Sequence, residues 1–265
     1  MQAHHSTQSR AVIFATGCGR SGTTAMRSAL SAHPGVLSSN TENNMVGDLL
    51  LACDINATIE SRRVAMQMTE EEHNRRFADF VLDLVFPDTD QVDSSRVPLL
   101  ASYMTPQIAE RAARMYPGSR FVCMLRDGVA TIESRMAHST FGQQSFQAQC
   151  EKWATWGSFY RWAMEREDCL IVRHEQLLVD PDGCMTRVLG FLGLEPNSAP
   201  IETLRTHRYH PTPDAERPRW ASWPDEDRRT FERICGEWMR AYGYAIPWGH
   251  AGETQAARCD ERPPL

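Results

Sequence analysis

The sequence predicts an α/β fold, a single domain in which a central, mainly parallel sheet is flanked by helices. Three observations support this prediction. Short apolar runs alternate with segments of helical periodicity, the pattern of parallel strands joined by helical crossovers. A glycine-rich turn connects the first apolar run to the first helical segment. The 265 residues can bury one core, so we expect one domain over 10–248 with flexible ends at 1–9 and 249–265.

Hydrophobic periodicity predicts the individual elements in order along the chain. Short apolar runs predict strands at 11–16, 35–38, 98–103 and 121–125. Longer segments with a helical repeat predict helices at 23–32, 45–86, 106–115, 129–135, 146–165 and 225–242. Thr69, followed by three glutamates, has the composition of a helix start within the second of these segments. The tryptophans of 146–165 have the spacing of a packed helix face, so we assign them to the core.

Composition and charge argue against several classes of partner. The formal net charge of −6 disfavours a nucleic acid or an anionic membrane surface as the main partner. No apolar run is long enough to cross a bilayer, and residues 1–10 lack the apolar segment of a signal peptide. The eight cysteines include no C-x-x-C pair, as expected of free thiols in a reducing compartment. We therefore expect a cytoplasmic protein with no nucleic-acid or membrane partner.

The segment between the first strand and the first helix has the composition of an anion-binding turn. Its glycines let the backbone wrap an anion, and the helix start adds positive potential. Arg20 supplies a fixed charge inside the turn. The candidate binding residues are Gly17, Gly19, Arg20, Ser21, Gly22, Thr23 and Thr24. The alternative interpretation is a strand-to-helix connection that binds no ligand.

The position of the cation distinguishes this turn from a nucleoside-triphosphate loop. In the motif G-x-x-x-x-G-K-[ST] a lysine follows the last glycine, whereas Thr23 occupies that place here and Arg20 carries the charge. The segment resembles the 5′-phosphosulfate loop of the sulfotransferase family. The resemblance spans about 11–245 and implies a P-loop NTPase-like sulfotransferase fold. It also implies the sulfuryl donor 3′-phosphoadenosine 5′-phosphosulfate (PAPS), whose product is adenosine 3′,5′-bisphosphate (PAP).

A second motif resembles the 3′-phosphate element of the same family, in which a strand ends in Arg-Asp-Pro. Arg126 follows the predicted strand 121–125, and Ser134 lies eight residues later. Gly128 stands where proline is usual. The resemblance implies that Arg126 and Ser134 bind the 3′-phosphate, which suits a bidentate guanidinium and a helix-face hydroxyl. The alternative is that Arg126 pairs with Asp127 or a nearby carboxylate.

A third segment, residues 170–181, resembles the strand and turn that the family usually writes V-R-Y-E-D-L. Residues 188–194 then resemble the expected helix end with a glycine stop. Arg173 and Glu175 could form an ion pair inside the fold. We therefore regard this segment as architectural.

A fourth segment, residues 217–220, resembles the G-R-W element that closes over the donor in bacterial and carbohydrate-modifying members. Proline stands where glycine is common. The resemblance makes Arg219 a candidate for a second 3′-phosphate contact, with Arg217 behind it. The alternative for Arg217 is a solvated charge on a loop.

The chemistry of sulfuryl transfer indicates which groups the site needs. In an in-line displacement, negative charge builds on the oxygen that leaves with the 5′-phosphate, and that oxygen needs a donor. Arg20 is placed for this role. A sulfuryl group carries less negative charge than a phosphoryl group, and the sequence has no obvious metal cage, so we expect no metal.

The acceptor must lose a proton, so a base is also expected. Residues 33–42 resemble the H-P-x-V segment of heparan-sulfate-type sulfotransferases, which implies Glu42 as the base; the alternative is a surface glutamate. Aryl and steroid relatives use histidine, which makes His138 a second candidate. Met104 occupies the place of a lysine that carbohydrate-modifying members often carry, so the lack of lysine argues against a carbohydrate-type site.

The function predicted is sulfuryl transfer to a hydroxyl, or less readily an amine, of a small metabolite, natural product or sugar, as in bacterial secondary metabolism. Two other classes are open. A P-loop kinase-like phosphotransferase would share the fold, but it should carry the loop lysine that is absent here. A non-catalytic nucleotide-binding protein would keep Arg126 and Ser134 and need no base. The sequence does not indicate the oligomeric state.

Overall fold

The computed structural model describes residues 10–39, 44–87, 95–206 and 219–248. The chain divides into two compact units, Met1–Arg126 with Ser158–Pro211 and Asp127–Gly157 with Thr212–Leu265. The single domain expected over 10–248 stays a prediction. The flexible ends expected at 1–9 and 249–265 lie outside the described residues.

The first unit contains the sheet. Its strands are β1 (Ile13–Gly17), β2 (Val36–Ser38), β3 (Val97–Ala101), β4 (Arg120–Leu125) and β5 (Cys169–Arg173). They form a five-stranded sheet in the order β2-β3-β1-β4-β5, and each neighbouring pair is parallel. The predicted α/β class with a central parallel sheet is therefore confirmed.

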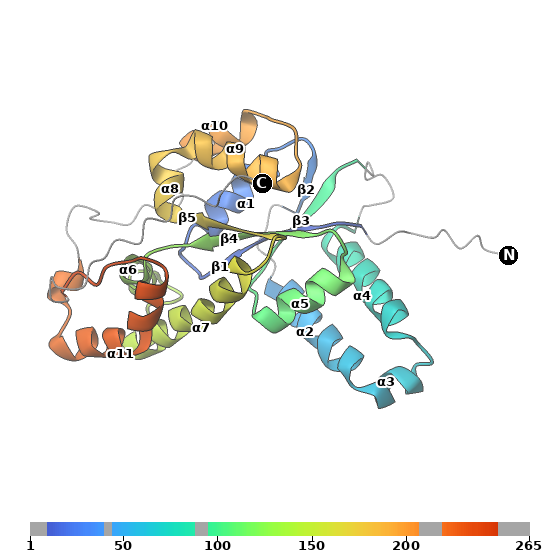
Figure 1. Cartoon of the computed structure of the whole chain (residues 1–265), viewed down its shortest axis with the longest axis horizontal. Helices are drawn as coiled ribbons and strands as arrows, with labels where there is room; N and C mark the ends of the chain where they lie inside the picture. The colour runs from blue at the N-terminus through green and yellow to red at the C-terminus, as the bar shows by residue number, and fades with distance from the viewer. Residues whose placement is uncertain (1–9, 40–43, 88–94, 207–218, 249–265) are drawn as a thin grey trace. The chain divides into compact units, whose positions relative to one another are not determined.

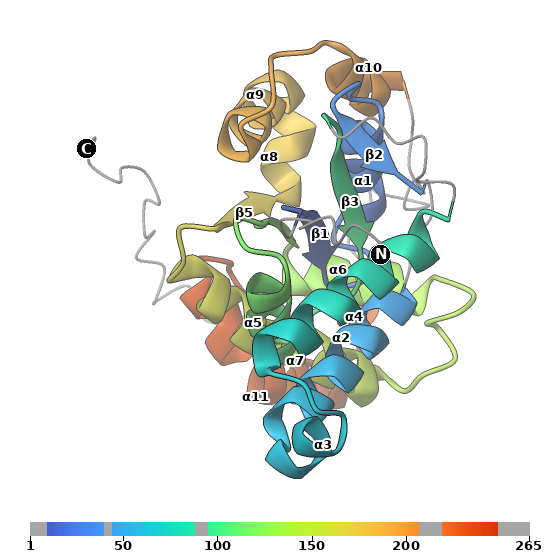
Figure 2. The same cartoon turned by 90° about the vertical axis from the view of Figure 1, so that its right-hand side faces the viewer.

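Helices cover both faces of this sheet, as Figures 1 and 2 show. One face is covered by α1 (Thr23–Ser31), α8 (His174–Val179), α9 (Pro181–Leu192) and α10 (Ala199–Thr206). The other is covered by α2 (Asn44–Thr58), α4 (Glu70–Val85), α5 (Pro106–Met115) and the end of α7 (Phe146–Met164), while the short α3 (Glu60–Ala65) lies between α2 and α4 away from the sheet. β1 is central, and the chain continues to β2 and β3 on one side before it crosses to β4 and β5. Its carboxyl end is therefore the point where strand order reverses, the usual ligand position in open α/β sheets.

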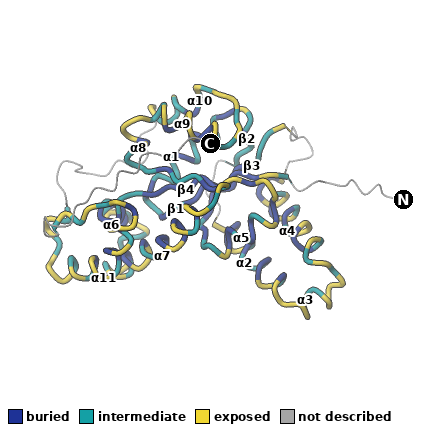
Figure 3. The backbone as a smooth tube through the Cα atoms, in the orientation of Figure 1, coloured by how far each residue is buried: buried dark blue, intermediate teal, exposed yellow. Residues whose placement is uncertain are grey.

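Alternation along the strands builds an apolar core on each face of the sheet. Ile13 and Ala15 of β1 pack into the same buried cluster as Met26 and Leu30 of α1. Phe14 points to the opposite face, as the two-residue period of a strand requires, and its ring stacks on that of Phe121 with centroids 5.0 Å apart. The inner strands β1, β3 and β4 are accordingly the most continuously buried part of this unit (Figure 3).

The second unit is helical in its described part. It contains α6 (Gly128–Met136), the first part of α7, the 3-10 turn η2 (Arg219–Ser222) and α11 (Asp225–Ala241). A Cβ on Gly128 would lie 2.9 Å from both Met239 Sδ and Trp153 Cζ2. Glycine therefore replaces the usual proline where α6 approaches two buried side chains.

The structure differs from the predicted elements in several places. The helical segment 45–86 is three helices, and Thr69 caps the last of them by accepting a hydrogen bond from Glu72 N at 3.1 Å. The strand predicted over 98–103 ends at Ala101, and the next residue contacts α2 through its side chain: Gly47 N donates to Ser102 Oγ at 3.0 Å. Helices α8 and α10 were not among the sequence predictions.

Candidate functional site

The predicted donor loop joins β1 to α1 at the centre of the sheet edge, and close packing explains its glycines. Gly17 has φ 154°, and a Cβ there would lie 2.5 Å from the backbone oxygen of Met124. Gly22 has φ 100°, and a Cβ there would lie 2.8 Å from His174 Cδ2. Both positions combine a backbone conformation that favours glycine with no room for a side chain. The loop therefore lies close to β4 and to the start of α8.

The backbone between these glycines has the form of an anion-binding nest. Ser21 N donates to Cys18 O at 2.9 Å, which closes the turn. Arg20 has φ 80°, a left-handed conformation that is uncommon for a residue with a side chain. A left-handed residue within a turn directs successive N–H groups to one side, where they can bind an anion. Gly22 caps α1 and has no side chain to accept from the first-turn N–H groups, so these also suit an anion.

Tyr160 of α7 fixes the start of this loop from within the core. Its hydroxyl accepts from Cys18 N at 3.0 Å and donates to Met124 O at 2.7 Å. The side chain is 1% exposed, and burial raises the pKa of its phenol well above the usual value. The phenol therefore stays protonated and ties the loop to β4. The sequence analysis did not identify Tyr160, because a single tyrosine on a predicted core helix has no distinguishing pattern.

Arg126 comes directly after β4, and the structure gives it a contact with the donor loop. Its Nη1 donates to the backbone oxygen of Arg20 at 2.9 Å. The two candidate donor-binding arginines are therefore neighbours, as parallel strands that end at one edge allow. A guanidinium carries five N–H donors, and this bond uses one of them. Arg126 thus combines a structural contact with its predicted binding role.

His174 is the second residue that sequence reasoning missed at this edge. It follows β5 directly, and its ring lies against Gly22. Burial and the positive charge of Arg126 lower the pKa of His174 to about 4. The imidazole is therefore neutral at physiological pH. Its position in the motif at 170–181 was the available signal, but the sequence analysis regarded that segment as architectural.

The second unit holds Ser134 on α6 and Arg219 at the start of η2. Asp127 caps α6 by accepting from Ala130 N at 2.8 Å, and Ser134 is 3% exposed. Glu133 accepts a hydrogen bond from Trp220 N. One carboxylate next to Ser134 therefore anchors the turn that begins with Arg219.

The other predicted site residues are His138, Glu42 and Arg217. His138 lies just after α6, where its Nδ1 accepts from Thr140 N at 3.2 Å and its ring lies 4.9 Å from that of Phe141. Glu42 and Arg217 lie outside the described residues. Their roles, and that of His138, stay predictions.

The described residues contain no group of three or more His, Cys, Asp or Glu side chains that could hold a metal ion. In the same part of the chain, no helix has both the length and the apolar character needed to cross a membrane. Metal-free chemistry and cytoplasmic location stay predictions.

Comparison with solved structures identifies proteins of the same fold. A sulfotransferase domain from the Synechococcus PCC 7002 olefin synthase aligns with a TM-score of 0.58 and 14% identity, covering 93% of this chain and all of that one (100%). A sulfotransferase from Alicyclobacillus acidocaldarius aligns with a TM-score of 0.54 and 17% identity over 90% of this chain and 98% of that one. A mouse sulfotransferase complexed with PAP aligns with a TM-score of 0.51 and 12% identity over 87% and 85%.

Sequence comparison finds relatives and a family. A protein-tyrosine sulfotransferase of Drosophila melanogaster is 27% identical over 207 residues, which is 71% of this chain and 39% of that protein. Protein-tyrosine sulfotransferase 1 of Danio rerio is 26% identical over 199 residues, 71% of this chain and 54% of that protein. The chain thus spans about half, or less, of the length of each of these relatives. The model of the sulfotransferase family matches residues 12–198. Together with the donor-loop geometry, this match shows that the chain belongs to the sulfotransferase family.

Proposed function

We propose that this chain transfers a sulfuryl group from PAPS to a hydroxyl of a small-molecule acceptor and releases PAP. The observation that carries the proposal is the loop after β1, in which Arg20 is left-handed and its backbone oxygen is bound by Arg126. This arrangement presents a fixed charge, inward N–H groups and a helix start at one point of the sheet edge. The mouse structure of the same fold was solved with PAP, which supports the choice of donor.

In the proposed reaction the acceptor oxygen attacks sulfur opposite the bridging oxygen of the donor. A bond forms between the acceptor oxygen and sulfur, while the bond from sulfur to the 5′-phosphate oxygen breaks. Negative charge builds on that departing oxygen, and Arg20 with the loop N–H groups stabilises it. Thr23 and Thr24 hold the 5′-phosphate, and the acceptor proton passes to a base of the chain.

The 3′-phosphate is assigned to Arg126 and Ser134, with Arg219 and Arg217 as further candidates. The assignment rests on the sequence motifs that contain these residues. Charge-assisted bonds from guanidinium groups suit a dianionic phosphate, and this phosphate distinguishes PAPS from AMP and ATP.

Glu42 is the proposed base, and His138 is the alternative. Glu42→Gln removes the basic group while nearly keeping its size, and we expect kcat to fall by about 100-fold or more. His138→Gln is the matched variant and should leave kcat within a few-fold of the parent. PAP affinity should be unchanged in both, as measured by titration. The reverse pattern of kcat values would assign the base to His138.

The acceptor class follows from two lines of support. The sequence favours a small metabolite, natural product or sugar, since it offers no basic stripe for a polyanionic glycan. The relatives named protein-tyrosine sulfotransferase favour a second candidate, the phenolic hydroxyl of tyrosine in a protein. We propose a hydroxyl acceptor in the cytoplasm, with phenols tested alongside aliphatic alcohols.

The experiment that tests the donor assignment is calorimetric titration with PAP, AMP and ATP in the presence of a chelator. We expect PAP to bind much more tightly than the other two, because only PAP carries the 3′-phosphate. Turnover is then measured with radiolabelled PAPS and a panel of hydroxyl acceptors, again in a chelator. An exposed arginine on α4 offers a control variant, Arg75→Ala, which should behave as the parent.

Each alternative gives a different result in this experiment. A P-loop kinase-like phosphotransferase would prefer ATP, and its activity would vanish in the chelator and return with Mg²⁺. A non-catalytic nucleotide-binding protein would bind PAP but sulfate none of the acceptors. Equal affinity for PAP and AMP would remove the basis of the 3′-phosphate assignment.

A further inference from the structure

The edge of the sheet beside the donor loop presents a second set of polar side chains, at the end of β3. β3 pairs with β1 in parallel register, with Ala101 opposite Ala15. The strands stay together beyond this pair, because Thr16 Oγ1 donates to Ser102 O at 2.8 Å. Continuing the register by two residues from the Ala15–Ala101 pair places Tyr103 level with Gly17, the first glycine of the donor loop. A group held by Tyr103 is therefore at the edge where transfer would occur.

The start of α2 is fixed at this same edge. Gly47 N donates to Ser102 Oγ at 3.0 Å. A Cβ on Gly47 would lie 2.8 Å from Tyr103 Cε1 and 3.0 Å from its backbone oxygen. Glycine thus lets the first turns of α2 lie directly against the end of β3. Because α2 begins at Asn44, the proposed base Glu42 is two residues before the helix.

Within this contact, Tyr103 holds the carboxylate of Asp48. The phenol hydroxyl donates to Asp48 Oδ1 at 2.6 Å. That bond, followed by burial and the negative charge of Asp48, raises the pKa of Tyr103 to about 12. The phenol therefore keeps its proton and acts as a donor to the carboxylate. Asp48 itself is exposed, and a carboxylate accepts several hydrogen bonds, so it can also bind a group from solution.

The chain neighbours of Tyr103 supply no charge that would offset this carboxylate. Ser102 and Met104 are both uncharged and buried, at 3% exposed each. Lys152 is the only lysine of the chain, and it lies on a different helix, α7. The end of β3 therefore offers a carboxylate held by Tyr103.

We propose that Asp48, oriented by Tyr103, binds a cationic or hydrogen-bond-donating group of the acceptor, and so selects cationic or neutral hydroxyl compounds over anionic ones. The inference rests on the proposed function, because it places the acceptor at the edge beside the donor loop. Its physical basis is charge complementarity: a fixed carboxylate attracts an ammonium group and repels a second carboxylate. Asp48 is a specificity-determining residue and Tyr103 a positioning residue in this scheme.

The test uses three phenols of similar size and different charge: tyramine, p-cresol and 4-hydroxyphenylacetate. With saturating PAPS, we expect kcat/KM to fall in that order, with tyramine at least about tenfold above 4-hydroxyphenylacetate. Asp48→Asn should reduce this ratio to within about threefold, mainly by raising KM for tyramine. Tyr103→Phe should reduce the ratio less, since the carboxylate remains but is no longer oriented. Asp83→Asn, at an exposed position on α4, is the matched control and should keep the parent ratio.

Two results would overturn the inference: a parent enzyme that prefers 4-hydroxyphenylacetate, or the same ratio in Asp48→Asn and the parent. Absence of turnover with all three phenols would overturn it as well. PAP titration of each variant separates these outcomes from failure of the proposed function, because donor binding does not involve Asp48. A parent protein that does not bind PAP would reject the proposed sulfotransferase activity itself. If Asp48→Asn does not fold, Tyr103→Phe carries the test through the same ratio.

Discussion

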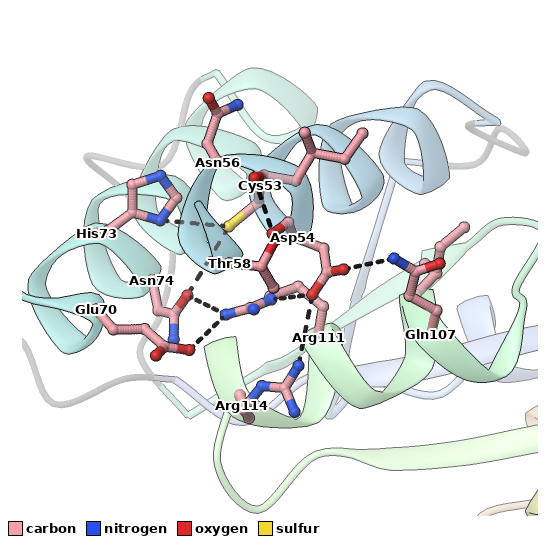
Figure 4. Close-up of polar contacts among 12 residues, drawn as sticks. Cys53, Asp54, Asn56, Thr58, Glu70, His73, Asn74, Gln107, Arg111 and Arg114 are labelled. Atoms are coloured by element: carbon pink, nitrogen blue, oxygen red, sulfur yellow. Dashed lines mark hydrogen bonds and ion pairs between the residues drawn. The ribbon is translucent and has the colours of Figure 1, made fainter. Parts of the chain in front are cut away.

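The two helix layers of the first unit differ in the interactions that hold their helices in place. On the face covered by α1 and α9 the contacts are apolar, with Met26, Leu30 and Met185 fully buried among strand side chains. On the other face, α2, α4 and α5 meet at a buried ion pair: Arg111 Nε donates to Asp54 Oδ1 at 2.8 Å (Figure 4). The first layer is held mainly by packing, with a bond from Ser31 Oγ of α1 to Ser38 Oγ of β2 at 2.7 Å, whereas the helices of the second layer are also joined to one another by charged and polar bonds.

The bonds around Arg111 connect all three helices of the second layer. Its Nη1 donates to Asn74 Oδ1 at 2.9 Å and to Glu70 Oε1 at 3.1 Å, both on α4. Gln107 Nε2 donates to the other oxygen of Asp54 at 2.6 Å. Burial alone would raise the pKa of Asp54, but the bonds from Gln107 and Arg111 hold it below its usual value. The difference between the layers teaches that α1 is positioned mainly by apolar packing, whereas a polar network orients α2, which carries the proposed specificity residue Asp48.

Removing one partner of the ion pair is the largest expected effect and the most direct way to break this comparison. Arg111→Met leaves the carboxylate of Asp54 buried without its main partner, and we expect the free energy of unfolding to fall by about 3–5 kcal/mol. The matched change on the apolar face is Leu30→Met, which conserves volume and should cost less than about 1.5 kcal/mol. Urea denaturation of both variants measures the contrast.

A double variant sharpens the interpretation of that result. Asp54→Leu with Arg111→Met removes both charges, so no carboxylate is left unpaired, and much of the lost stability should return. Equal destabilisation by the double and the single variant would show that packing, and not charge pairing, holds α2 in place. The comparison between the two layers would then fail.

Arg20→Ala tests the donor side, where we expect a large loss of activity without a loss of stability. Removing a preorganised donor to the departing oxygen commonly costs about 100-fold or more in kcat. Position 20 is left-handed in the structure. Alanine and arginine are both non-glycine residues, so we expect the same backbone strain in the variant and the parent. The measurements are kcat with saturating PAPS and acceptor, and urea denaturation. A kcat within a few-fold of the parent would remove Arg20 from the mechanism.

The donor side was largely predictable from the sequence, because backbone geometry leaves a strong residue pattern. Glycines at 17 and 22 are required by close packing and positive φ, and their spacing locates the loop. Register between parallel strands then places Arg126 near it, as two strands that end at the same edge must. The contact between Arg126 and the backbone of Arg20 has no such pattern and appears only in the structure.

The acceptor side was not predictable in the same way, because its contacts join residues far apart in sequence through side chains. In the sequence, no pattern distinguishes Asp54 and Arg111 from other charged helix residues. Their ion pair forms only because α2 and α5 pack together. The Asp48–Tyr103 bond is equally hidden, since Tyr103 was assigned to the end of a strand. Glu42 stays a prediction from resemblance, because the structure does not describe it.

Tyr160→Phe is expected to have an intermediate effect, because it links the packed core to the donor loop. The variant keeps the ring but leaves Cys18 N and Met124 O without the hydroxyl that bonds both, which should cost about 1–3 kcal/mol of stability. The loop should also become less ordered, so PAP affinity should fall several-fold. Tyr116→Phe is the matched control, since its buried hydroxyl bonds Ala78 O away from the loop. A similar loss of PAP affinity in both variants would indicate a general effect of core hydroxyls.

The smallest expected effect is a pH dependence that His174 confers on stability. Its pKa is about 4 in the folded protein, because of burial and the charge of Arg126, and about 6.5 when unfolded. Between these values the unfolded state binds more protons, so this contribution is complete above about pH 6.5 and declines as pH falls towards 4. At pH 5.5 the loss should be about 1.4 kcal/mol relative to pH 7.5, and His174→Gln should abolish it.

His73 also has a lowered pKa, through burial and the charge of Arg111, so it contributes to the pH profile of the parent protein. It lies in the polar network of the α2, α4 and α5 layer, whereas His174 lies beside the donor loop. The difference between the profiles of the parent and His174→Gln therefore isolates the donor side, and a His73→Gln variant isolates the other layer. Parallel profiles for the parent and His174→Gln would mean that neither burial nor Arg126 lowers the pKa of this imidazole. In that case the close contact between His174 and Gly22 would be steric only.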